Sequence, residues 1–471
     1  MKPEFYNIET FEKIMSLEES KGRLKEFCYS KETKAMSQVI KDLRQELRSK
    51  KGEKREQLKL QLEELNQQYE EQKKAEITEV YHKVINGKHP VVLREVEAKG
   101  KTAYAVGDMP SLLISKFIAI EIKNQYQLHT ANRDEIVEEL RVLLDNPMPK
   151  ILIRTDIHHF YESIPQAKLI EKIEADDYLS VISTRYLHKF FYEYNCLTNN
   201  QEHKGLPRGL SFSPALSEIY LQDFDRKVRH IDGVYFFKRY VDDIVLLANP
   251  NKITIENCWK AIKEVSGSLG LDIHEDDDKV VLALLNTDRV EATKFKYLGY
   301  QFCYNQGHTE LLLTEEKVAR YCQTIDCILK AYAKVANYRT RDENGRKHTD
   351  GITQMMHRFE ALTGNGNLDS RRNFVKTGIY YSNRLLTDLT QLDNLDKYLA
   401  EALNDTVRFN PPHSLFNYGE GNCFEESVNR IKEKIITQYG FKKGFCERRM
   451  YRWNNYVVVL KQLQNLYYKS L

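Results

Sequence analysis

The chain has little of what marks several common protein classes. Its 471 residues include eight cysteines, and no two of them form a C-x-x-C pair, so the sequence indicates neither a zinc knuckle nor a disulfide framework. No run approaches the ~18 to 20 apolar residues needed to cross a bilayer, and the first residues lack the apolar stretch of a signal peptide. We therefore expect a cytoplasmic protein without a membrane partner.

A strong excess of either charge is also missing. The 71 Lys and Arg residues nearly balance the 68 Asp and Glu residues, which leaves a formal net charge of +3. This balance neither requires nor excludes a nucleic-acid partner, because such a protein needs a local basic channel rather than a basic whole. Apolar residues make up 41% of the chain, which is enough for several cores in two or three domains.

The first third of the chain reads as helices around one short β-hairpin. Apolar residues recur three and four positions apart on both sides of a polar turn at 48–54, which predicts a helical hairpin over 34–85. We interpret this hairpin as packing on the body of the protein, with self-association or RNA binding as alternatives. Strand-like alternation over 88–107 predicts a β-hairpin, and helices follow to about residue 145.

The rest of the chain divides into a mixed region and a helical region. Strands and helices alternate over 150–302, and after Gly299 the pattern predicts helices again. Thr314 suits a helix start because its side chain can cap the helix and two glutamates follow it. The polar segment 339–350 interrupts these helices as a mobile loop or a boundary. The predicted domains are an N-terminal helical extension (1–87), a central α+β domain (88–302) and an α-helical C-terminal domain (303–471).

An acidic pair lies between two apolar, strand-like runs. Asp242 and Asp243 follow Tyr240 and precede the apolar run 244–248. Adjacent like charges between strands are costly unless a cation compensates them, and a divalent metal ion does so. An ordinary acidic hairpin turn is the alternative for this string taken alone.

A further carboxylate, Asp156, ends the apolar strand 150–156, and Tyr161 follows five residues later. If this strand lies beside the acidic pair, three carboxylates converge at one point. A two-metal site for phosphoryl transfer requires such a convergence. For Tyr161 the alternative is a packing role in the core, where aromatic residues near strand ends are usually found.

A loop of glycine and proline lies between the two acidic elements. It runs from Gly205 to Pro214, and its last two residues suit a helix start. A glycine such as Gly209 lets a backbone approach a base pair or a template strand closely. A common loop-to-helix junction is the alternative, which the position of the loop between the two acidic elements weakens.

The three strings, in this order, resemble the palm motifs of the reverse-transcriptase family. That family has an aspartate strand, a G-x-P-x-G-x-x-x-S-P loop and a Y-x-D-D hairpin. Residues 269–279 look like its next motif, and 296–300 look like its primer grip. The resemblance covers 150–302 closely and 88–150 loosely. It implies an α+β right-hand polymerase with fingers and palm, an antiparallel palm sheet, an N-terminal helical hairpin and an α-helical, thumb-like C-terminal domain.

The resemblance also implies roles for individual residues. Two Mg²⁺ ions, which Mn²⁺ can replace, would be bound at Asp156, Ile157, Asp242 and Asp243. Lys279 would protonate the leaving pyrophosphate, and the ring of Tyr161 would exclude a 2′-hydroxyl. Arg208 stands where the family usually has glutamine, so it would touch template or triphosphate. The other expected contacts are Phe160, Gly209, Ser213, Tyr240, Lys99 and Lys101 for the nucleotide, and Leu298, Gly299 and Tyr300 for the primer end.

The long α-helical C-terminal region and the phrases at 132–137, 160–165 and 376–383 resemble the bacterial defence-associated reverse transcriptases, including the abortive-infection type. The sequence lacks the strings of retron enzymes, a zinc-type nuclease cluster and an obvious ribonuclease H pattern. The resemblance implies RNA-directed DNA synthesis from dNTPs in phage defence, on a noncoding RNA template, as a homo-oligomer or with a partner defence protein. The alternatives are template-independent or protein-primed synthesis, a palm-type nucleotide cyclase and a non-catalytic RNA-binding scaffold. The segment 441–453 is either a single-strand-binding surface or an amphipathic basic helix.

Overall fold

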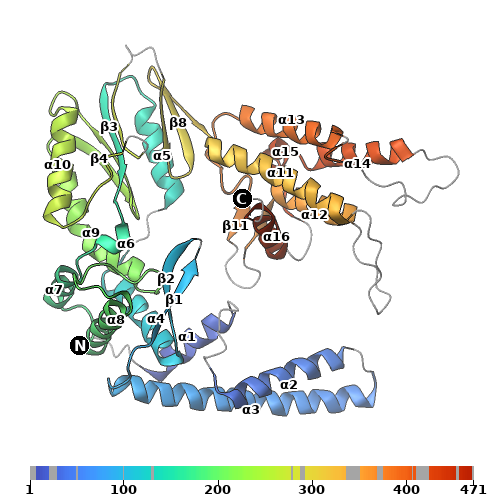
Figure 1. Ribbon diagram of the computed structural model, residues 1–471. Coiled ribbons are helices and arrows are strands. Elements are labelled where there is room, and N and C mark those ends of the chain that lie inside the picture. Colours follow the sequence, from blue (N-terminus) through green and yellow to red (C-terminus); the bar gives the residue numbers. More distant parts are fainter. Residues whose placement is uncertain are drawn as a thin grey trace. The chain divides into compact units, whose positions relative to one another are not determined.

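The computed structural model in Figure 1 divides into two compact units. The first is made of Met1–Ala131 and Ile151–Leu282, and the second of Asn132–Lys150 and Ala283–Leu471. The three predicted domains, whose two boundaries follow motifs rather than contacts, stay predictions. The structure describes residues 7–20, 29–48, 51–98, 100–128, 132–276, 279–286, 292–335, 351–368, 375–405, 407–409, 424–451 and 456–468.

The first unit begins with helices. These are α1 (Ile8–Ser20), α2 (Lys31–Leu47) and α3 (Glu53–Ile85). Thr33 near the start of α2 donates a hydrogen bond to Glu76 near the end of α3 (2.6 Å), and Arg44 donates to Asn66 (3.1 Å), so α2 and α3 are antiparallel. The predicted helical hairpin is therefore confirmed. The C-terminal part of α3 joins the main core of the unit, which anchors the hairpin on the body of the protein.

The predicted β-hairpin is also present. Strands β1 (Leu93–Ala98) and β2 (Lys101–Val106) pair antiparallel around Gly100, whose φ of +71° suits a residue without a side chain. Helix α4 (Met109–Gln125) follows, and the side chain of Asp108 caps it by accepting a hydrogen bond from the Ser111 N–H (2.8 Å). The pattern of residues 88–145 thus led to the correct elements.

A mixed region of strands and helices completes the first unit. Its sheet has the strand order β4-β5-β3-β6, and β5 pairs antiparallel with both β4 and β3. Residues 244–248 of β5 are fully buried, because helices cover this part of the sheet. The elements are β3 (Lys150–Asp156), α6 (Phe160–Ser163), α7 (Gln166–Asp176), α8 (Val181–Thr198), α9 (Ser213–Arg229), β4 (Val234–Tyr240), β5 (Asp243–Ala248), α10 (Ile255–Ser268) and β6 (Val281–Leu285).

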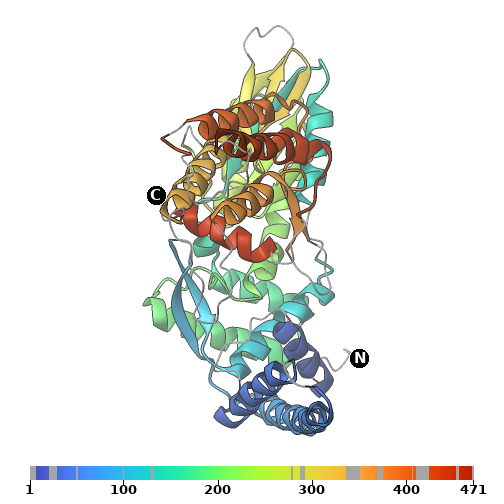
Figure 2. The same ribbon diagram turned by 90° about the vertical axis from the view of Figure 1, so that its right-hand side faces the viewer.

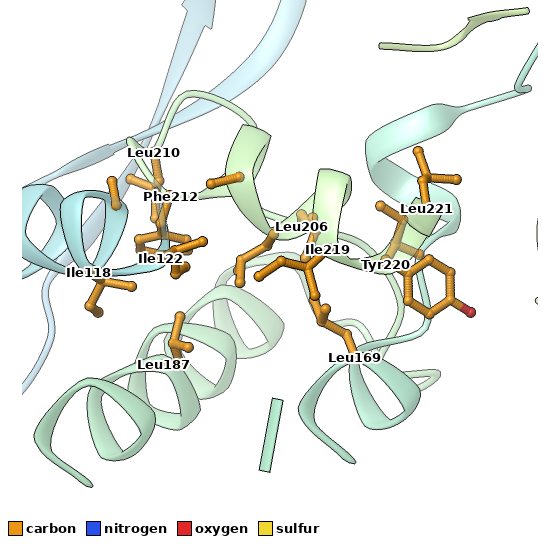
Figure 3. Packing of buried hydrophobic residues seen from close by; sticks show 14 of the residues in the cluster. Ile118, Ile122, Leu169, Leu187, Leu206, Leu210, Phe212, Ile219, Tyr220 and Leu221 are labelled. Carbon is orange, nitrogen blue, oxygen red and sulfur yellow. The ribbon is translucent and has the colours of Figure 1, made fainter. Parts of the chain in front are cut away.

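Helix α9 lies at the centre of the main core. Figure 3 shows Ile219 of α9 among side chains from α7 and α8, near Leu206 in the loop before the helix. Leu206, Leu210 and Phe212 of this loop are almost fully buried. Apolar burial on this scale fixes a loop as firmly as a helix. The Gly205–Pro214 loop is therefore part of the rigid scaffold around the sheet.

The second unit contains a short antiparallel sheet, of which the sequence analysis expected only the hairpin at 296–300. It is formed by β7 (Thr293–Tyr297), β8 (Tyr300–Asn305) and β9 (His308–Leu312). The prediction of helices directly after Gly299 is wrong for 300–312, because buried aromatic residues alternate with more exposed ones along β8, as in a strand. Helix α11 (Glu315–Val335) then begins directly after Thr314, as predicted.

Helices dominate the rest of the second unit, and Figure 2 shows those after residue 300, from yellow to red, from another side. Phe441 and Phe445 are buried in its core, which favours the amphipathic-helix interpretation for this part of 441–453. Residues 339–350 and 452–455 lie outside the described residues. The elements are α5 (Arg133–Leu144), α12 (Gly351–Thr363), β10 (Asn365–Asn367), β11 (Lys376–Gly378), α13 (Thr390–Asn404), α14 (Phe424–Gln438), α15 (Phe441–Cys446) and α16 (Tyr456–Tyr468). No helix among the described residues is long and apolar enough to cross a membrane.

Candidate active site

The register of the sheet brings the predicted carboxylates together. Asp156, the last residue of β3, lies directly opposite Asp243, the first residue of β5. Residues opposed in this way have Cβ atoms about 4.5–5.5 Å apart. Asp242 lies in the two-residue turn that joins β4 to β5, next to Asp243. The three carboxylates therefore converge at one end of the sheet. Asp156 comes from β3, and the other two come from the β4–β5 hairpin, which also carries Tyr240.

Asp243 experiences the charges of both other carboxylates. Burial raises the pKa of the Asp243 carboxyl above its ordinary value, and the nearby Arg154 guanidinium opposes this shift. The negative charges of Asp242 and Asp156 raise this pKa further. Because the charges of Asp242 and Asp156 disfavour the ionised form of Asp243, this site favours a cation that can enter it.

Two cations of the protein itself pair with these carboxylates. The Lys279 ammonium lies 3.1 Å from Asp156 Oδ2, and Arg154 Nη2 lies 3.0 Å from Asp243 Oδ1. Among the residues that the structure describes, no group of three or more His, Cys, Asp or Glu side chains is arranged as a metal site.

The donor atoms nevertheless fit a hard divalent cation. Asp156 Oδ1 is buried and has no hydrogen-bond partner in the described part of the chain, which is unfavourable for a carboxylate oxygen. Carboxylate and carbonyl oxygens are the ligands that Mg²⁺ and Mn²⁺ prefer. Ile157 can offer only its backbone carbonyl, because its side chain is a hydrocarbon and its N–H donates to the Asp242 carbonyl (3.1 Å).

Arg154 was not among the predicted site residues. It precedes Asp156 by two positions on β3, so both side chains lie on the same face of the strand. Besides pairing with Asp243, its guanidinium donates to the backbone carbonyl of Lys279. Arg154 thus joins the acidic hairpin to the segment that carries Lys279. The period of two along the predicted strand was the signal that could have identified it.

Arg239 is a second residue that the sequence analysis missed. Its side chain is only 4% exposed and binds Glu218 and Asp225 of α9, with nitrogen–oxygen distances of 2.7–3.1 Å. It also donates to the carbonyl of Val241 (2.8 Å), in the turn before Asp242. Val241 has a φ of +60°, which is strained for a β-branched residue, so the turn needs such support.

The hydroxyl of Tyr161 experiences the negative charge of Asp242. Burial raises the pKa of its hydroxyl, and the charge of Asp242 raises it further. The Arg208 guanidinium lies 5.7 Å from the centre of the Tyr161 ring, and its Nη2 is 2.9 Å from Glu162. Phe160, by contrast, is 5% exposed and its side chain belongs to the core.

The loop residues have close contacts within the protein. A Cβ at Gly209, where φ is +102°, would lie 2.7 Å from the carbonyl oxygen of Tyr104, so the glycine allows the loop to approach β2. Ser213 is fully buried and donates to the Pro207 carbonyl (2.8 Å). These contacts explain both residues structurally, and direct contact of the Ser213 side chain with a nucleotide receives no support from its burial.

The remaining predicted residues are spread over both units. Lys101 is exposed on β2, and Lys99 lies outside the described residues. Leu298 and Gly299 form the turn between β7 and β8 in the second unit, and both have positive φ, as a type I′ hairpin turn requires. Arg133 Nε donates to the Leu298 carbonyl (2.7 Å) and stabilises this turn, while Tyr300 is fully buried.

The Arg239 network yields a stability prediction. Arg239→Met leaves Asp225 and Glu218 without their partner, so we expect the free energy of unfolding to fall by about 2–3 kcal/mol, less than for a fully buried pair because Glu218 is 40% exposed. Urea unfolding followed by circular dichroism measures this change. The control is Arg226→Gln, whose side chain is 68% exposed and for which we expect at most about 0.5 kcal/mol. Equal stability of Arg239→Met and wild type would contradict the role of the network.

Solved structures of yeast telomerases are similar to this chain at low sequence identity. The apo telomerase of Candida tropicalis truncated from its C-terminal domain is 12% identical with a TM-score of 0.32, over 47% of this chain and 55% of that chain. The telomerase of Candida albicans in complex with a TWJ fragment of telomeric RNA is 10% identical with a TM-score of 0.36, over 83% and 64%. This chain thus spans less than two thirds of the length of these telomerase chains. None of the curated proteins compared with the chain matches it.

A family model gives the clearest comparison. Residues 111–302 match the model described as reverse transcriptase (RNA-dependent DNA polymerase). The matched segment contains β3 with Asp156, the Gly205–Pro214 loop and the hairpin with Asp242 and Asp243. This part of the chain is therefore similar to a reverse transcriptase domain, and it combines helices with antiparallel strands.

Proposed function

We propose that the chain is an RNA-directed DNA polymerase that extends a primer with dNTPs and releases pyrophosphate. The observation that carries the proposal is the pairing of Asp156 with Asp243 across β3 and β5, inside a domain that matches the reverse transcriptase family. Two opposed carboxylates and a third in the adjoining turn destabilise the sheet by like-charge repulsion. A metal-dependent phosphoryl transfer requires such a group of carboxylates.

Asp156, Asp242 and Asp243, with the backbone of Ile157, are the residues that would hold two Mg²⁺ ions, or Mn²⁺ in their place. When bound, such ions lower the pKa of the primer 3′-hydroxyl and neutralise the charge that develops on the pyrophosphate. Before the ions bind, Arg154 and Lys279 compensate part of the negative charge of the carboxylates. Once released from Asp156, the Lys279 ammonium can donate its proton to the leaving pyrophosphate.

Residues around the carboxylates would select the nucleotide. We assign Tyr161 to the exclusion of the 2′-hydroxyl from its position five residues after Asp156, as the resemblance implies. The charge of Asp242 also raises the pKa of its hydroxyl. Arg208 can contact template or triphosphate if it separates from Glu162. The ion pair between these two side chains is partly exposed and therefore weak. Tyr240 and Lys101 are retained as nucleotide contacts, and Leu298, Gly299 and Tyr300 as the primer grip.

The wider assignments rest on the sequence resemblance. In this proposal the β1–β2 hairpin belongs to the fingers, the sheet with β3, β4 and β5 to the palm, and residues 303–471 to a thumb-like domain. The defence-associated resemblance supports phage defence with a noncoding RNA template, in a homo-oligomer or with a partner defence protein. Template-independent or protein-primed synthesis by the same carboxylates is the alternative within this class.

One assay separates these activities. The purified chain is incubated with Mg²⁺, labelled dNTPs or NTPs and the RNA that co-purifies with it. Long DNA that disappears after ribonuclease treatment of the RNA supports templated synthesis, and long DNA that persists supports template-independent synthesis. A small cyclic product would indicate a nucleotide cyclase, and no product a binding scaffold. Sequencing the co-purified nucleic acid identifies the template.

The carboxylates yield the first activity prediction. The double substitution Asp242→Asn with Asp243→Asn should lower DNA synthesis at least about a thousandfold, because it removes two of the three charged metal ligands. The melting temperature should stay the same or rise, since like-charge repulsion is relieved. The matched control is Asp232→Asn, whose side chain is 81% exposed near β4 and which should keep full activity. Synthesis by the double variant at a rate near that of wild type would refute this site.

The second activity prediction concerns Tyr161. Tyr161→Ala should admit ribonucleotides and lower the preference for dNTP over NTP by about tenfold or more, because a ring that blocks a 2′-hydroxyl is removed. Single-nucleotide incorporation with each sugar measures the ratio of kcat/KM values. Tyr161→Phe keeps the ring and serves as the control, with the preference retained. An unchanged sugar preference in Tyr161→Ala would count against this role.

A further inference from the structure

A small cavity in the second unit contains none of the residues assigned to polymerisation. It lies between α11, α16 and the loop 377–383, and its volume is about 250 Å³. Ligand pockets usually start at roughly 300 Å³, so this one has room for a single small group such as one nucleotide or part of it. Ala361 and Leu362 of α12 also line it, and Figure 1 shows α11, α12 and α16 in the second unit.

One wall of the cavity is cationic. Lys317 and Arg320 lie three positions apart on α11, on the same side of the helix. Lys317 Nζ donates to the neutral side chain of Asn383 (2.8 Å) and lies 5.3 Å from the centre of the Tyr300 ring. In the described part of the chain, no carboxylate is within ion-pair distance of either cation. Their charge is therefore available to an anion that enters the cavity.

The surroundings of Lys317 add to this positive character. Burial, Arg133 and Arg320 lower the pKa of Lys317 to about 8, which shows how poorly its charge is compensated. Asp134 is a carboxylate whose charge favours the protonated Lys317, but it is itself paired with Arg384 at 2.6 Å. A bound phosphate would supply the missing negative charge.

The lining of the cavity also includes a tyrosine whose hydroxyl has no hydrogen-bond partner in the described part of the chain, and further aromatic rings. Tyr456 at the start of α16 is 6% exposed, and its hydroxyl has no hydrogen-bond partner among the described residues. A buried hydroxyl without a partner costs free energy, which a ligand oxygen would recover. Thr377 and Ser382 add two more hydroxyls, 3.3 Å apart. The ring of Tyr468, more than half exposed, lies at the same cavity and can stack on a base.

We propose that this cavity binds a nucleotide through its phosphate, with Lys317 and Arg320 as the cationic ligands and Tyr456 as a hydroxyl donor. Phosphate oxygens accept hydrogen bonds from all of these groups, and an aromatic ring near them suits an attached base. The limited volume excludes a duplex. The nucleotide is either free in solution or the 5′-phosphorylated end of a single strand, and the same chemistry recognises both.

The test measures binding of a fluorescent DNA tetranucleotide with and without a 5′-phosphate to the full chain in EDTA. EDTA prevents metal-dependent phosphate binding at the carboxylates, and both oligonucleotides bind equally to any surface that contacts only the backbone. We expect the 5′-phosphorylated oligonucleotide to bind about tenfold more tightly. Competition by dAMP tests the second source, a free nucleotide.

Variants identify the site. Arg320→Gln should remove the preference for the 5′-phosphate and the competition by dAMP, and it should fold normally because Arg320 is exposed. Tyr456→Phe should weaken both effects without the loss of any hydrogen bond to the described residues. The control is Lys330→Gln, which removes an equally exposed cation of α11 outside the cavity and should change neither.

Each result decides the proposal. The proposal is supported by tighter binding of the 5′-phosphorylated strand, by competition from dAMP, or by both, if the effect disappears in Arg320→Gln. The effect that is observed shows whether the ligand is a strand end or a free nucleotide. Equal binding of both oligonucleotides without competition by dAMP would overturn it, as would a preference that survives in Arg320→Gln. Neither outcome depends on DNA synthesis, so the proposed polymerase activity stands or fails separately.

Discussion

The fold holds two negative charges opposite each other where β3 and β5 pair. Asp156 and Asp243 face each other in the antiparallel register, an arrangement that by itself destabilises a sheet. The register cannot shift to avoid it, because a slip of one residue would move the buried residues of both strands to the wrong face. Apolar burial along 151–153 and 244–248 therefore fixes the carboxylates in place, and the chemistry of the domain follows from that constraint.

Cations from other parts of the first unit make this arrangement tolerable. Arg154 and Lys279 pair with the carboxylates themselves, whereas Arg239 acts on the turn behind them through its contact with Val241. Such partly exposed ion pairs contribute little stability and are easily exchanged for another cation. The ion pairs of Arg239 are different, because they join the acidic hairpin to α9. We expect these ion pairs to stay intact during a reaction cycle. The site thus combines a rigid frame with replaceable counter-charges.

Much of this could be predicted from the sequence, since the evidence was local. The helical hairpin, the β-hairpin at Gly100 and the start of α11 follow from periodicity and capping, and the order of the acidic strings indicated the family. Residues 300–312 were wrongly assigned to helices because aromatic residues occur in both strands and helices. The pairing of β8 with β7 and β9 shows that these residues form strands. Arg239 was missed because its partners on α9 lie far from it in the chain. The loop glycine Gly209 was expected to approach a nucleic acid, yet the atom nearest to it belongs to β2, a contact that no sequence pattern reveals.

The central claim is that one bound cation contacts both the end of β3 and the acidic turn. Fe²⁺ binds at oxygen-rich sites of this kind, and with ascorbate and peroxide it cleaves the backbone close to where it is bound. Mass spectrometry of the fragments from the full chain then locates the ion. The account predicts cleavage near Asp156 and near Asp242–Asp243 in the same sample, both suppressed by excess Mg²⁺. Cleavage at only one of these places, or cleavage that Mg²⁺ does not suppress, would contradict it.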